Sequence, residues 1–261
     1  MTNLRTYGQA PYQVAVIHGG PGAAGEMAPV AQELAPGRGV LEPLQTARSV
    51  AGQVGELKKV LEENGDLPVI LVGFSWGAWL GFLVAAHHPS LVRKLILIGS
   101  GPFEEKYVAR LQETRLSRLS EDERMEYRSV LARLSDARAQ SQDASLERLG
   151  ELASKTDSCD PLRGEPEAIA FQAEIHQRVW QDAVEMRRSG RLLGLARQVR
   201  CPVVAIHGDY DPHPAEGVQE PLSAALQDFR FHLLEHCGHT PWMEKQAREA
   251  FYRTLKDELH S

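Results

Sequence analysis

A serine stands between two glycines at Gly73–Gly77, which reads Gly-Phe-Ser-Trp-Gly. These residues follow the apolar run Pro68–Val72 and overlap the start of the apolar segment Trp76–His87. A G-x-S-x-G pattern between a strand and a helix is typical of a nucleophile elbow, a turn so sharp that glycines must flank the serine. Without that context the pattern would indicate only a turn, but here it predicts Ser75 as a nucleophile.

A serine hydroxyl attacks a carbonyl only when a base accepts its proton and an acid orients that base. Three histidines near the C-terminus could be the base. His232 lies inside the apolar run Phe229–Leu234 and is typical of a structural residue, whereas His236 is a loop neighbour. His239 comes next to Gly238 beyond the run, so we take His239 as the base.

Two aspartates follow the apolar run Pro202–Ile206, and either could be the acid. Both Asp209 and Asp211 satisfy the chain order of serine, acid and histidine expected with this elbow. Either could instead stabilise a turn after a strand. At this point the choice between them stays open.

A reaction at a carbonyl also develops an oxyanion, which needs hydrogen-bond donors placed in advance. We expect the amide of Trp76, directly after the serine, to be one donor. We assign the second to Gly20 in the segment His18–Gly22, where consecutive glycines let bare backbone approach the substrate. His18 precedes these glycines, so we expect it to brace the loop by hydrogen bonding rather than to act as a base.

Short apolar runs bounded by turn residues predict strands buried on both faces. Helical patterns lie between most of them, at 47–63 and 76–87 and again in the tail at 244–259. Strands that alternate with helices predict an α/β fold, with a mostly parallel sheet flanked by helices. The predicted strands are Gln13–Ile17, Val40–Leu44, Pro68–Val72, Lys94–Ile98, Pro202–Ile206 and Phe229–Leu234.

The alternation stops in the middle third of the chain. Residues 101–200 hold 35 of the 64 Asp, Glu, Lys and Arg residues, and between Phe103 and Gln198 no segment predicts a strand. We therefore predict a catalytic core of residues 1–101 and 199–261 and a helical cap of residues 102–198, whose mixed charge is a solvated surface. The helix signals are a capping box at Ser120 and Glu123, a three-residue step at Leu146, Leu149 and Leu152, and Pro166, which can open a helix to about Met186.

The composition argues against several partners and compartments. The formal net charge is −6 and no run of basic residues occurs, so we expect neither nucleic acid nor an anionic membrane as a partner. No apolar run approaches the roughly 18 residues of a membrane span, and the N-terminus lacks the pattern of a signal peptide. Together with three widely spaced cysteines, Cys159, Cys201 and Cys237, this favours free thiols and a cytoplasmic location.

Four segments together resemble the α/β-hydrolase superfamily, in particular the branch of proline iminopeptidases and related esterases. The resemblance implies that Asp211 rather than Asp209 is the acid. It also implies a helical cap inserted after the sixth strand of the family's standard sheet, where the charged middle third falls. The segments are His18–Gly22, Gly73–Gly77, Gly208–Asp211, and Gly238–His239 with Glu244 five residues later.

The chain departs from the iminopeptidases in three places. Only about a dozen residues precede the first predicted strand, where the family usually has two more strands, so we expect a sheet of about six. The Asp-Gln-Arg-Gly segment of those peptidases is missing, because the chain reads Glu42–Thr46 there. Cap glutamates of those peptidases hold the substrate's free amine, and Glu174–His176 resembles one such segment. Glu174 is therefore a candidate substrate-binding residue, with an ordinary exposed glutamate as the alternative.

These observations predict a serine hydrolase that cleaves an ester or amide of a small molecule or short peptide. An acyl-enzyme would form on Ser75, with His239 and Asp211 completing the triad, and we expect no cofactor and no metal. A proline iminopeptidase-type aminopeptidase is the narrower alternative. A catalytically silent ligand-binding protein that keeps the same fold is the alternative from another class.

Overall fold

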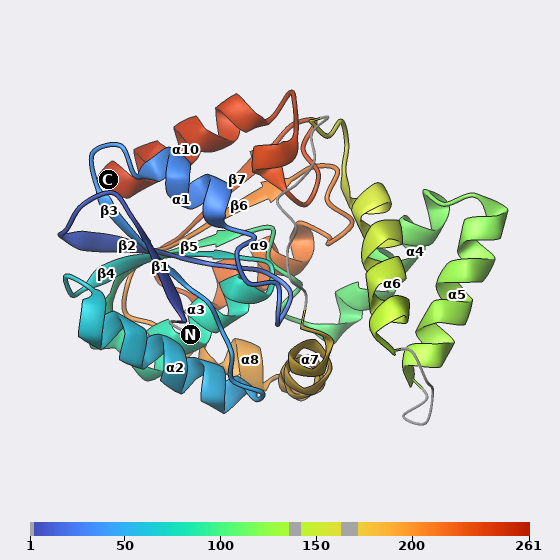
Figure 1. Ribbon diagram of the computed structural model, residues 1–261, viewed down its shortest axis with the longest axis horizontal. Coiled ribbons are helices and arrows are strands. Elements are labelled where there is room, and N and C mark those ends of the chain that lie inside the picture. The colour runs from blue at the N-terminus through green and yellow to red at the C-terminus, as the bar shows by residue number, and fades with distance from the viewer. Residues whose placement is uncertain (1–2, 136–141, 163–171) are drawn as a thin grey trace.

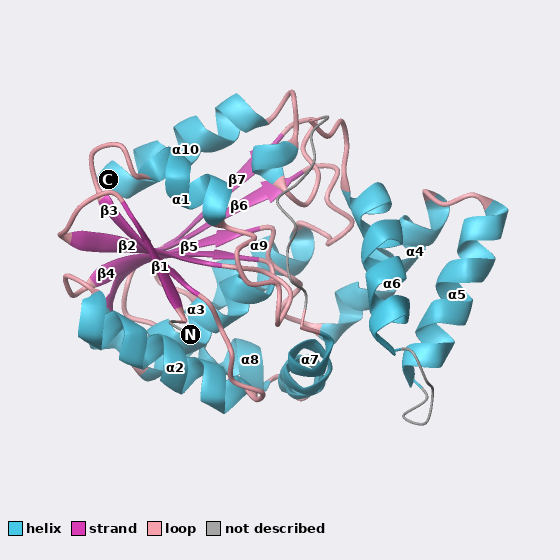
Figure 2. Ribbon diagram, in the orientation of Figure 1, coloured by secondary structure: helices cyan, strands magenta, loops and turns pink. Residues whose placement is uncertain are grey.

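The computed structural model describes residues 3–135, 142–162 and 172–261. Its centre is a seven-stranded sheet in the order β1-β3-β2-β4-β5-β6-β7, in which only β1 is antiparallel to its neighbour (Figures 1 and 2). The strands are β1 (Leu4–Tyr7), β2 (Tyr12–Ile17), β3 (Gly39–Pro43), β4 (Val69–Phe74), β5 (Val92–Ile98), β6 (Val203–Gly208) and β7 (Phe229–Leu234).

All six predicted strands are present within one or two residues of their predicted ends, and the predicted α/β class is confirmed. The structure adds a seventh strand, β1, to the expected six. It is only four residues long, lies at the edge of the sheet and buries no side chain completely. An edge strand of this kind carries no apolar alternation, which is the signal that the sequence prediction used.

Helices cover both faces of the sheet, as Figure 2 shows. Side chains of β2 alternate between two cores, with Val14 and Val16 on one face and Ala15 and Ile17 on the other. The first face packs against α1 and α10, and the second against α2, α3 and α9. These helices are α1 (Ala28–Leu34), α2 (Val50–Asn64), α3 (Trp76–His87), α9 (Glu216–Ala225) and α10 (Arg248–His260).

The described part of the middle third contains helices and no named strand, in line with the sequence prediction. Helices α4, α5 and α6 extend away from the sheet and share a small core of their own, whereas α7 and α8 add side chains to the main core (Figure 1). The proposed division into core and cap stays a prediction. The helices are α4 (Val108–Ser117), α5 (Glu121–Ser135), α6 (Gln142–Asp157), α7 (Ala173–Arg188) and α8 (Arg191–Gly194).

The capping box at the start of α5 is confirmed. The amide of Ser120 donates to Glu123 Oε2 at 2.9 Å, and the amide of Glu123 donates to Ser120 Oγ at 3.4 Å. Leu146, Leu149 and Leu152 lie on α6, so the helix that their spacing predicted is confirmed. Leu149 and Leu152 also pack in the small core of α4–α6, and the side chain of Leu146 lies outside the described part of the structure. Pro166 lies outside the described residues, and the helix expected after it is described from Ala173 onward.

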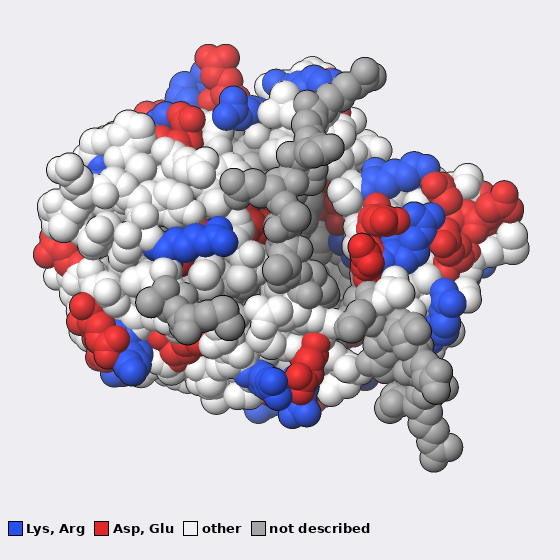
Figure 3. Space-filling model, viewed as in Figure 1, with Lys and Arg blue, Asp and Glu red and all other residues white. Residues whose placement is uncertain are grey.

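Figure 3 shows basic and acidic side chains interspersed over the lobe that α4–α6 form. Many of them are paired: Arg148 binds Glu126 and Glu151, and Lys155 binds Glu123. The high charge of this region is therefore a solvated helix surface with both signs neighbouring each other. Among the described residues, no helix has the length and apolar character needed to cross a membrane.

A buried charge attaches the last helix to the sheet. Lys94 on β5 is almost fully buried, and its ammonium donates to the backbone oxygen of Glu258 at 2.5 Å and to the carboxylate of Glu258 at 3.2 Å. Ser261 Oγ accepts a further bond at 2.6 Å. Removing the ammonium breaks these bonds and leaves the buried carboxylate of Glu258 with fewer donors, and that loss is unfavourable.

We expect Lys94→Met, which keeps the length of the side chain, to lower the free energy of unfolding by about 1–3 kcal/mol. Lys59→Met is the matched control, because Lys59 pairs with Glu63 on the exposed surface of α2. Urea unfolding followed by circular dichroism measures both. Equal stability of the two variants would contradict the structural role of Lys94.

Candidate active site

Ser75 lies between β4 and α3 in a strained backbone conformation, with φ 51° and ψ −114°. Positive φ is unfavourable for a residue with a side chain and marks a sharp turn. A Cβ atom on Gly73 would lie under 3.0 Å from the backbone of Gly77, and one on Gly77 would lie equally close to the backbone oxygen of Ile17. Glycine is therefore required on both sides, as the sequence predicted. Ser75 itself is partly exposed, while Phe74 and Trp76 are buried.

Asp211 and His239 come together at the carboxyl ends of β6 and β7. His239 Nδ1 lies 2.7 Å from Asp211 Oδ2, and the side chain of Asp211 is fully buried. Asp209 has another partner, because its Oδ1 accepts the amide of Cys237 at 3.0 Å. Of the two aspartates left open by the sequence, Asp211 is the one that contacts the histidine.

The end of β5 lies between the elbow and His239. The amide of Ser75 donates to the backbone oxygen of Ile98 at 2.9 Å, and Gly99, the next residue, lies against the ring of His239. The ring also packs against Phe74, directly before the serine, with ring centroids 4.9 Å apart. Asp211 and His239 therefore lie near the elbow at one edge of the sheet, and a triad of Ser75, Asp211 and His239 stays a prediction.

The electrostatics of the pair suit a base held by a carboxylate. Burial alone would lower the pKa of His239, but the charge and hydrogen bond of Asp211 outweigh burial and raise it above the usual 6.5. Burial alone would raise the pKa of Asp211, but the neighbouring His239, His213 and His207 hold it well below its usual range. Asp211 is therefore ionised throughout the neutral range, and an imidazolium at His239 would be stabilised.

The other two histidines considered as bases lie elsewhere. His232 Nε2 pairs with Glu258 at 2.9 Å, on the side of the sheet that α10 covers. His236 is exposed in the turn after β7, with φ 53°. Neither contacts Asp211, so the choice of His239 agrees with the geometry.

The segment His18–Gly22 forms the loop after β2, where the sequence placed the second oxyanion donor. His18 is fully buried, with Nδ1 2.9 Å from the oxygen of Gly19, and its Nε2 accepts the amide of Gln45 at 3.2 Å. Burial lowers the pKa of His18 to about 4, so the ring is neutral and braces the loop as expected. The oxygen of Gly20 accepts the amide of Ala23 at 2.8 Å, which fixes the turn.

Trp76 is the first residue of α3, and the first amides of a helix have no acceptor within it. Its backbone amide is therefore available to an oxyanion. Its indole Nε1 donates to Gln53 Oε1 at 2.8 Å, which anchors the side chain to α2. The assignment of Gly20 and Trp76 as the two donors stays a prediction.

Three features of the site escaped the sequence analysis. Glu26 accepts the amide of Gly19 at 3.0 Å, and burial raises its pKa to about 7 against the opposing effect of the nearby His239. His213 shares the carboxylate of Asp211 with His239. The backbone oxygen of Asp157 accepts the amide of His239 at 2.7 Å. Single polar residues in loops carry no periodic pattern, although Asp211-Pro-His-Pro214 is an unusual run that could have drawn attention to His213.

Glu174, the predicted substrate-binding residue, is exposed near the start of α7. Its Oε1 lies 3.0 Å from Arg48 and 3.3 Å from Arg178. Gln172, directly before α7, does reach the loop after β2, since its amide donates to the oxygen of Gly22 at 3.0 Å. The binding role of Glu174 stays a prediction, and its carboxylate is already paired.

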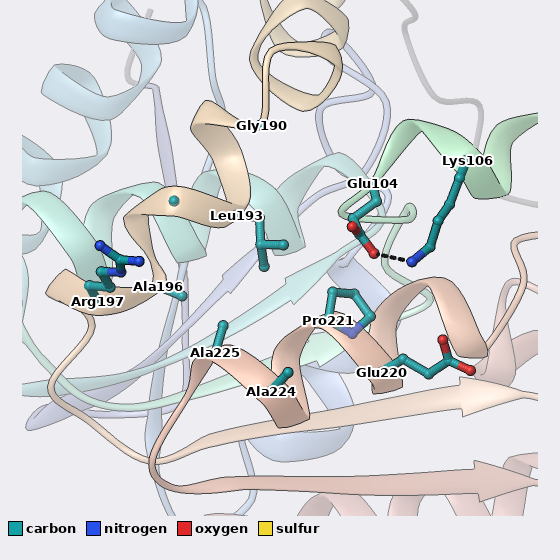
Figure 4. Close-up of a pocket in the computed structure, with 11 residues that line it drawn as sticks. Glu104, Lys106, Gly190, Leu193, Ala196, Arg197, Glu220, Pro221, Ala224 and Ala225 are labelled. Atoms are coloured by element: carbon teal, nitrogen blue, oxygen red, sulfur yellow. Dashed lines mark ion pairs between the residues drawn. The ribbon is translucent and has the colours of Figure 1, made fainter.

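The cavity in Figure 4 is separate from this cluster. It has a volume of about 600 Å³ and lies between α8 and α9, where Glu104 pairs with Lys106 at 2.9 Å. None of Ser75, Asp211 and His239 lines it. The predicted catalytic residues therefore lie outside this cavity.

Asp211, His213 and His239 are the one group among the described residues whose ligand atoms are close enough to hold a metal ion, all within 4.8 Å. Each oxygen of Asp211 already lies 2.7 Å from an imidazole Nδ1. A bound ion would displace the protons that orient both rings. We therefore describe the group as a hydrogen-bonded cluster.

Comparison with known proteins decides the family. A family model described as the alpha/beta hydrolase fold matches residues 49–246, which include the elbow and the Asp211–His239 pair. The chain belongs to the α/β-hydrolase family. The resemblance inferred from the sequence is confirmed at this level.

Individual relatives of this hydrolase differ in activity. It is 26% identical to the pimeloyl-[acyl-carrier protein] methyl ester esterase of Chromobacterium violaceum over 99% of this chain and 98% of the esterase. The crystal structure of VinJ is similar with a TM-score of 0.73 at 20% identity, covering 98% of this chain and 94% of VinJ. Proline iminopeptidase of Mycobacterium smegmatis is similar with a TM-score of 0.62 at 19% identity, covering 98% and 93%. The two structures support the fold, and the esterase is a relative along nearly the whole chain.

The close approach at the elbow predicts a large effect of one methyl group. In Gly77→Ala the new Cβ would meet the backbone of β2, so we expect a loss of at least about 2 kcal/mol in the free energy of unfolding. Gly55→Ala is the control, since a Cβ there meets nothing within 4 Å and the exchange removes a helix glycine, a gain of about 0.5–1 kcal/mol. Chemical denaturation of both variants is the measurement, and a fully stable Gly77→Ala protein would contradict the described elbow.

Proposed function

We propose that this α/β-hydrolase is a serine hydrolase that cleaves an ester or amide bond of a small molecule or short peptide through an acyl-enzyme on Ser75. The observation that carries the proposal is the 2.7 Å contact between buried Asp211 and His239, placed beside a strained serine turn. Nucleophile, base and orienting acid are the parts that acyl transfer needs. The 26% sequence identity to an esterase, over 99% of this chain, supports the same reaction class.

Each residue has a defined part in the proposed reaction. A carboxylate only accepts hydrogen bonds, so the His239 nitrogen that faces Asp211 carries the proton, and Nε2 is left to accept the proton of Ser75. The serine oxygen then attacks the carbonyl, and the amides of Gly20 and Trp76 stabilise the oxyanion. His239 returns the proton to the leaving group, and water activated by the same ring releases the acyl group.

Among the substrates considered, we favour esters over peptides with a free N-terminal amine. An amine would need an available carboxylate near the cap, and Glu174 is bound to Arg48 and Arg178 instead. The two arginines thereby compensate the negative charge of Glu174, so this charge would attract a substrate's ammonium group less strongly. The aminopeptidase alternative thus lacks the feature that would favour it.

Turnover should depend completely on Ser75. We expect Ser75→Ala to reduce kcat on responsive substrates at least about 10⁴-fold, while the unfolding midpoint stays near that of the wild type. The panel comprises p-nitrophenyl esters of increasing acyl length beside prolyl and alanyl arylamides. Turnover of esters in preference to arylamides supports the ester preference, whereas turnover of the prolyl arylamide alone would replace that preference with the aminopeptidase alternative. Undiminished activity of Ser75→Ala would contradict the mechanism.

The two neighbouring aspartates should behave differently. Asp211→Asn keeps the shape but removes the charge that orients His239, so we expect kcat to fall about 10³–10⁴-fold. Asp209→Asn retains an oxygen for the amide of Cys237, so we expect a fall of less than about tenfold. Kinetics of both purified variants on the best ester of the panel give the comparison. The reverse order would reassign the acid to Asp209.

A further inference from the structure

The carboxylate of Asp211 contacts two imidazole rings rather than one. Its Oδ2 lies 2.7 Å from Nδ1 of His239, and its Oδ1 lies 2.7 Å from Nδ1 of His213. The backbone amide of His213 also donates to Oδ1, at 2.9 Å. Both oxygens of the buried carboxylate are therefore fixed in direction by donors from two loops, and only one of those donors belongs to the proposed triad.

The protonation of His213 follows from its surroundings. Because a carboxylate only accepts, Nδ1 of His213 must carry the proton in this contact. Burial lowers the pKa of His213 to about 4, outweighing the opposite effect of Asp211 and aided by His239. The ring is therefore a neutral donor at neutral pH, which leaves the charge of Asp211 available to an imidazolium at His239.

The backbone around His213 is held rigidly. Pro212 and Pro214 flank it, and each proline fixes its own φ. His207 Nε2 lies 2.8 Å from the backbone oxygen of His213, and a backbone oxygen accepts, so His207 donates here. His207 is itself 1% exposed at the end of β6. Because the backbone of His213 is already rigid, its side chain loses little conformational freedom when it donates to Asp211. His213 can therefore fix the orientation of the carboxylate.

His213 also contacts the proposed base directly. The rings of His213 and His239 are stacked, with centroids 4.4 Å apart and planes 27° from parallel. Phe74 contacts the same His239 ring with a centroid distance of 4.9 Å. Stacking neighbours restrict rotation of the imidazole, whose correct orientation is a condition of proton transfer.

We propose that His213 is a positioning residue of this hydrolase: its Nδ1–H holds Oδ1 of Asp211 so that Oδ2 faces His239, and its ring restricts the ring of His239. This inference rests on the proposed serine-hydrolase function. It goes beyond that function because the triad alone does not require a second imidazole. A purely structural role in the turn would use only the backbone amide of His213, and then the ring would be dispensable.

Two substitutions separate the donor from the ring. His213→Asn keeps an N–H near the position of Nδ1 and loses the ring, whereas His213→Phe keeps a ring and loses the donor. The probe is a fluorophosphonate, whose labelling rate at the serine needs no knowledge of the substrate, and the best p-nitrophenyl ester supplies kcat and KM. We expect His213→Phe to lower the labelling rate and kcat at least tenfold with little change in KM, and His213→Asn to recover most of that loss.

The pH profile of labelling gives a readout that a structural role would not move. The titratable or charged groups around the paired rings of His213 and His239 are Asp211, His207, Arg115, Asp157 and Glu26. Without the donor at Oδ1, more of the carboxylate's charge acts on His239 and raises its pKa. Because labelling needs neutral His239, the acid limb should move to higher pH in His213→Phe and return toward the wild-type position in His213→Asn.

The outcomes separate this inference from the proposed function. If the wild type is labelled at the serine but His213→Phe has the wild-type rate and the wild-type acid limb, the inference is overturned and the triad stands. If the folded wild type is not labelled, both fail. Thermal unfolding confirms that each variant is folded, and His213→Ala, smaller and without a donor, replaces His213→Phe if the larger ring prevents folding.

Discussion

The site depends on how closely the turn after β4 approaches the neighbouring strand. The backbone of Gly77 lies against Ile17 and His18 at the end of β2, and Gly73 lies against Gly77. This contact leaves no space for a Cβ, bends the chain sharply enough to give Ser75 a positive φ, and brings the start of α3 beside the loop that contains Gly20. One steric constraint thereby positions both the proposed nucleophile and the proposed oxyanion loop, and the two cores on either side of the sheet supply the energy that maintains it.

A second constraint is the buried charge of Asp211. An isolated carboxylate in this position would be strongly unfavourable, so its stability depends on the donors around it. The same donors make it a suitable partner for an imidazolium. The stability of the fold and the proposed reaction therefore require the same arrangement, in which hydrogen-bond donors stabilise the carboxylate of Asp211 without protonating it.

The helices beyond the sheet are connected to this arrangement through the histidine loop. Arg115 on α4 pairs with Asp157 at the end of α6, and the backbone oxygen of Asp157 accepts the amide of His239. Glu244 accepts the amides of Gly238 and Cys159. Changes in the packing of α4–α6 would therefore reach the proposed base through backbone hydrogen bonds.

The sequence predicted the buried strands and the elbow well, because apolar runs and flanking glycines are local signals. It missed β1, which is short and half exposed, and also α1 and α9. The choice between Asp209 and Asp211 needed a family resemblance, because both residues lie in the same turn. Only the three-dimensional structure shows that Asp209 accepts the amide of Cys237, whereas Asp211 contacts His239. His213 was missed because its role depends on a stack with a residue 26 positions later, which no local pattern encodes.

The most direct test of the account is the location of covalent labelling by a fluorophosphonate. Folded wild-type protein is treated with the reagent, digested, and mapped by tandem mass spectrometry, beside protein unfolded in urea before treatment. The account predicts one adduct, on Ser75, in the folded protein and none in the unfolded protein, because only the folded chain supplies the base and the oxyanion donors. Folded protein without an adduct on Ser75, or with labelling that survives unfolding, would contradict it.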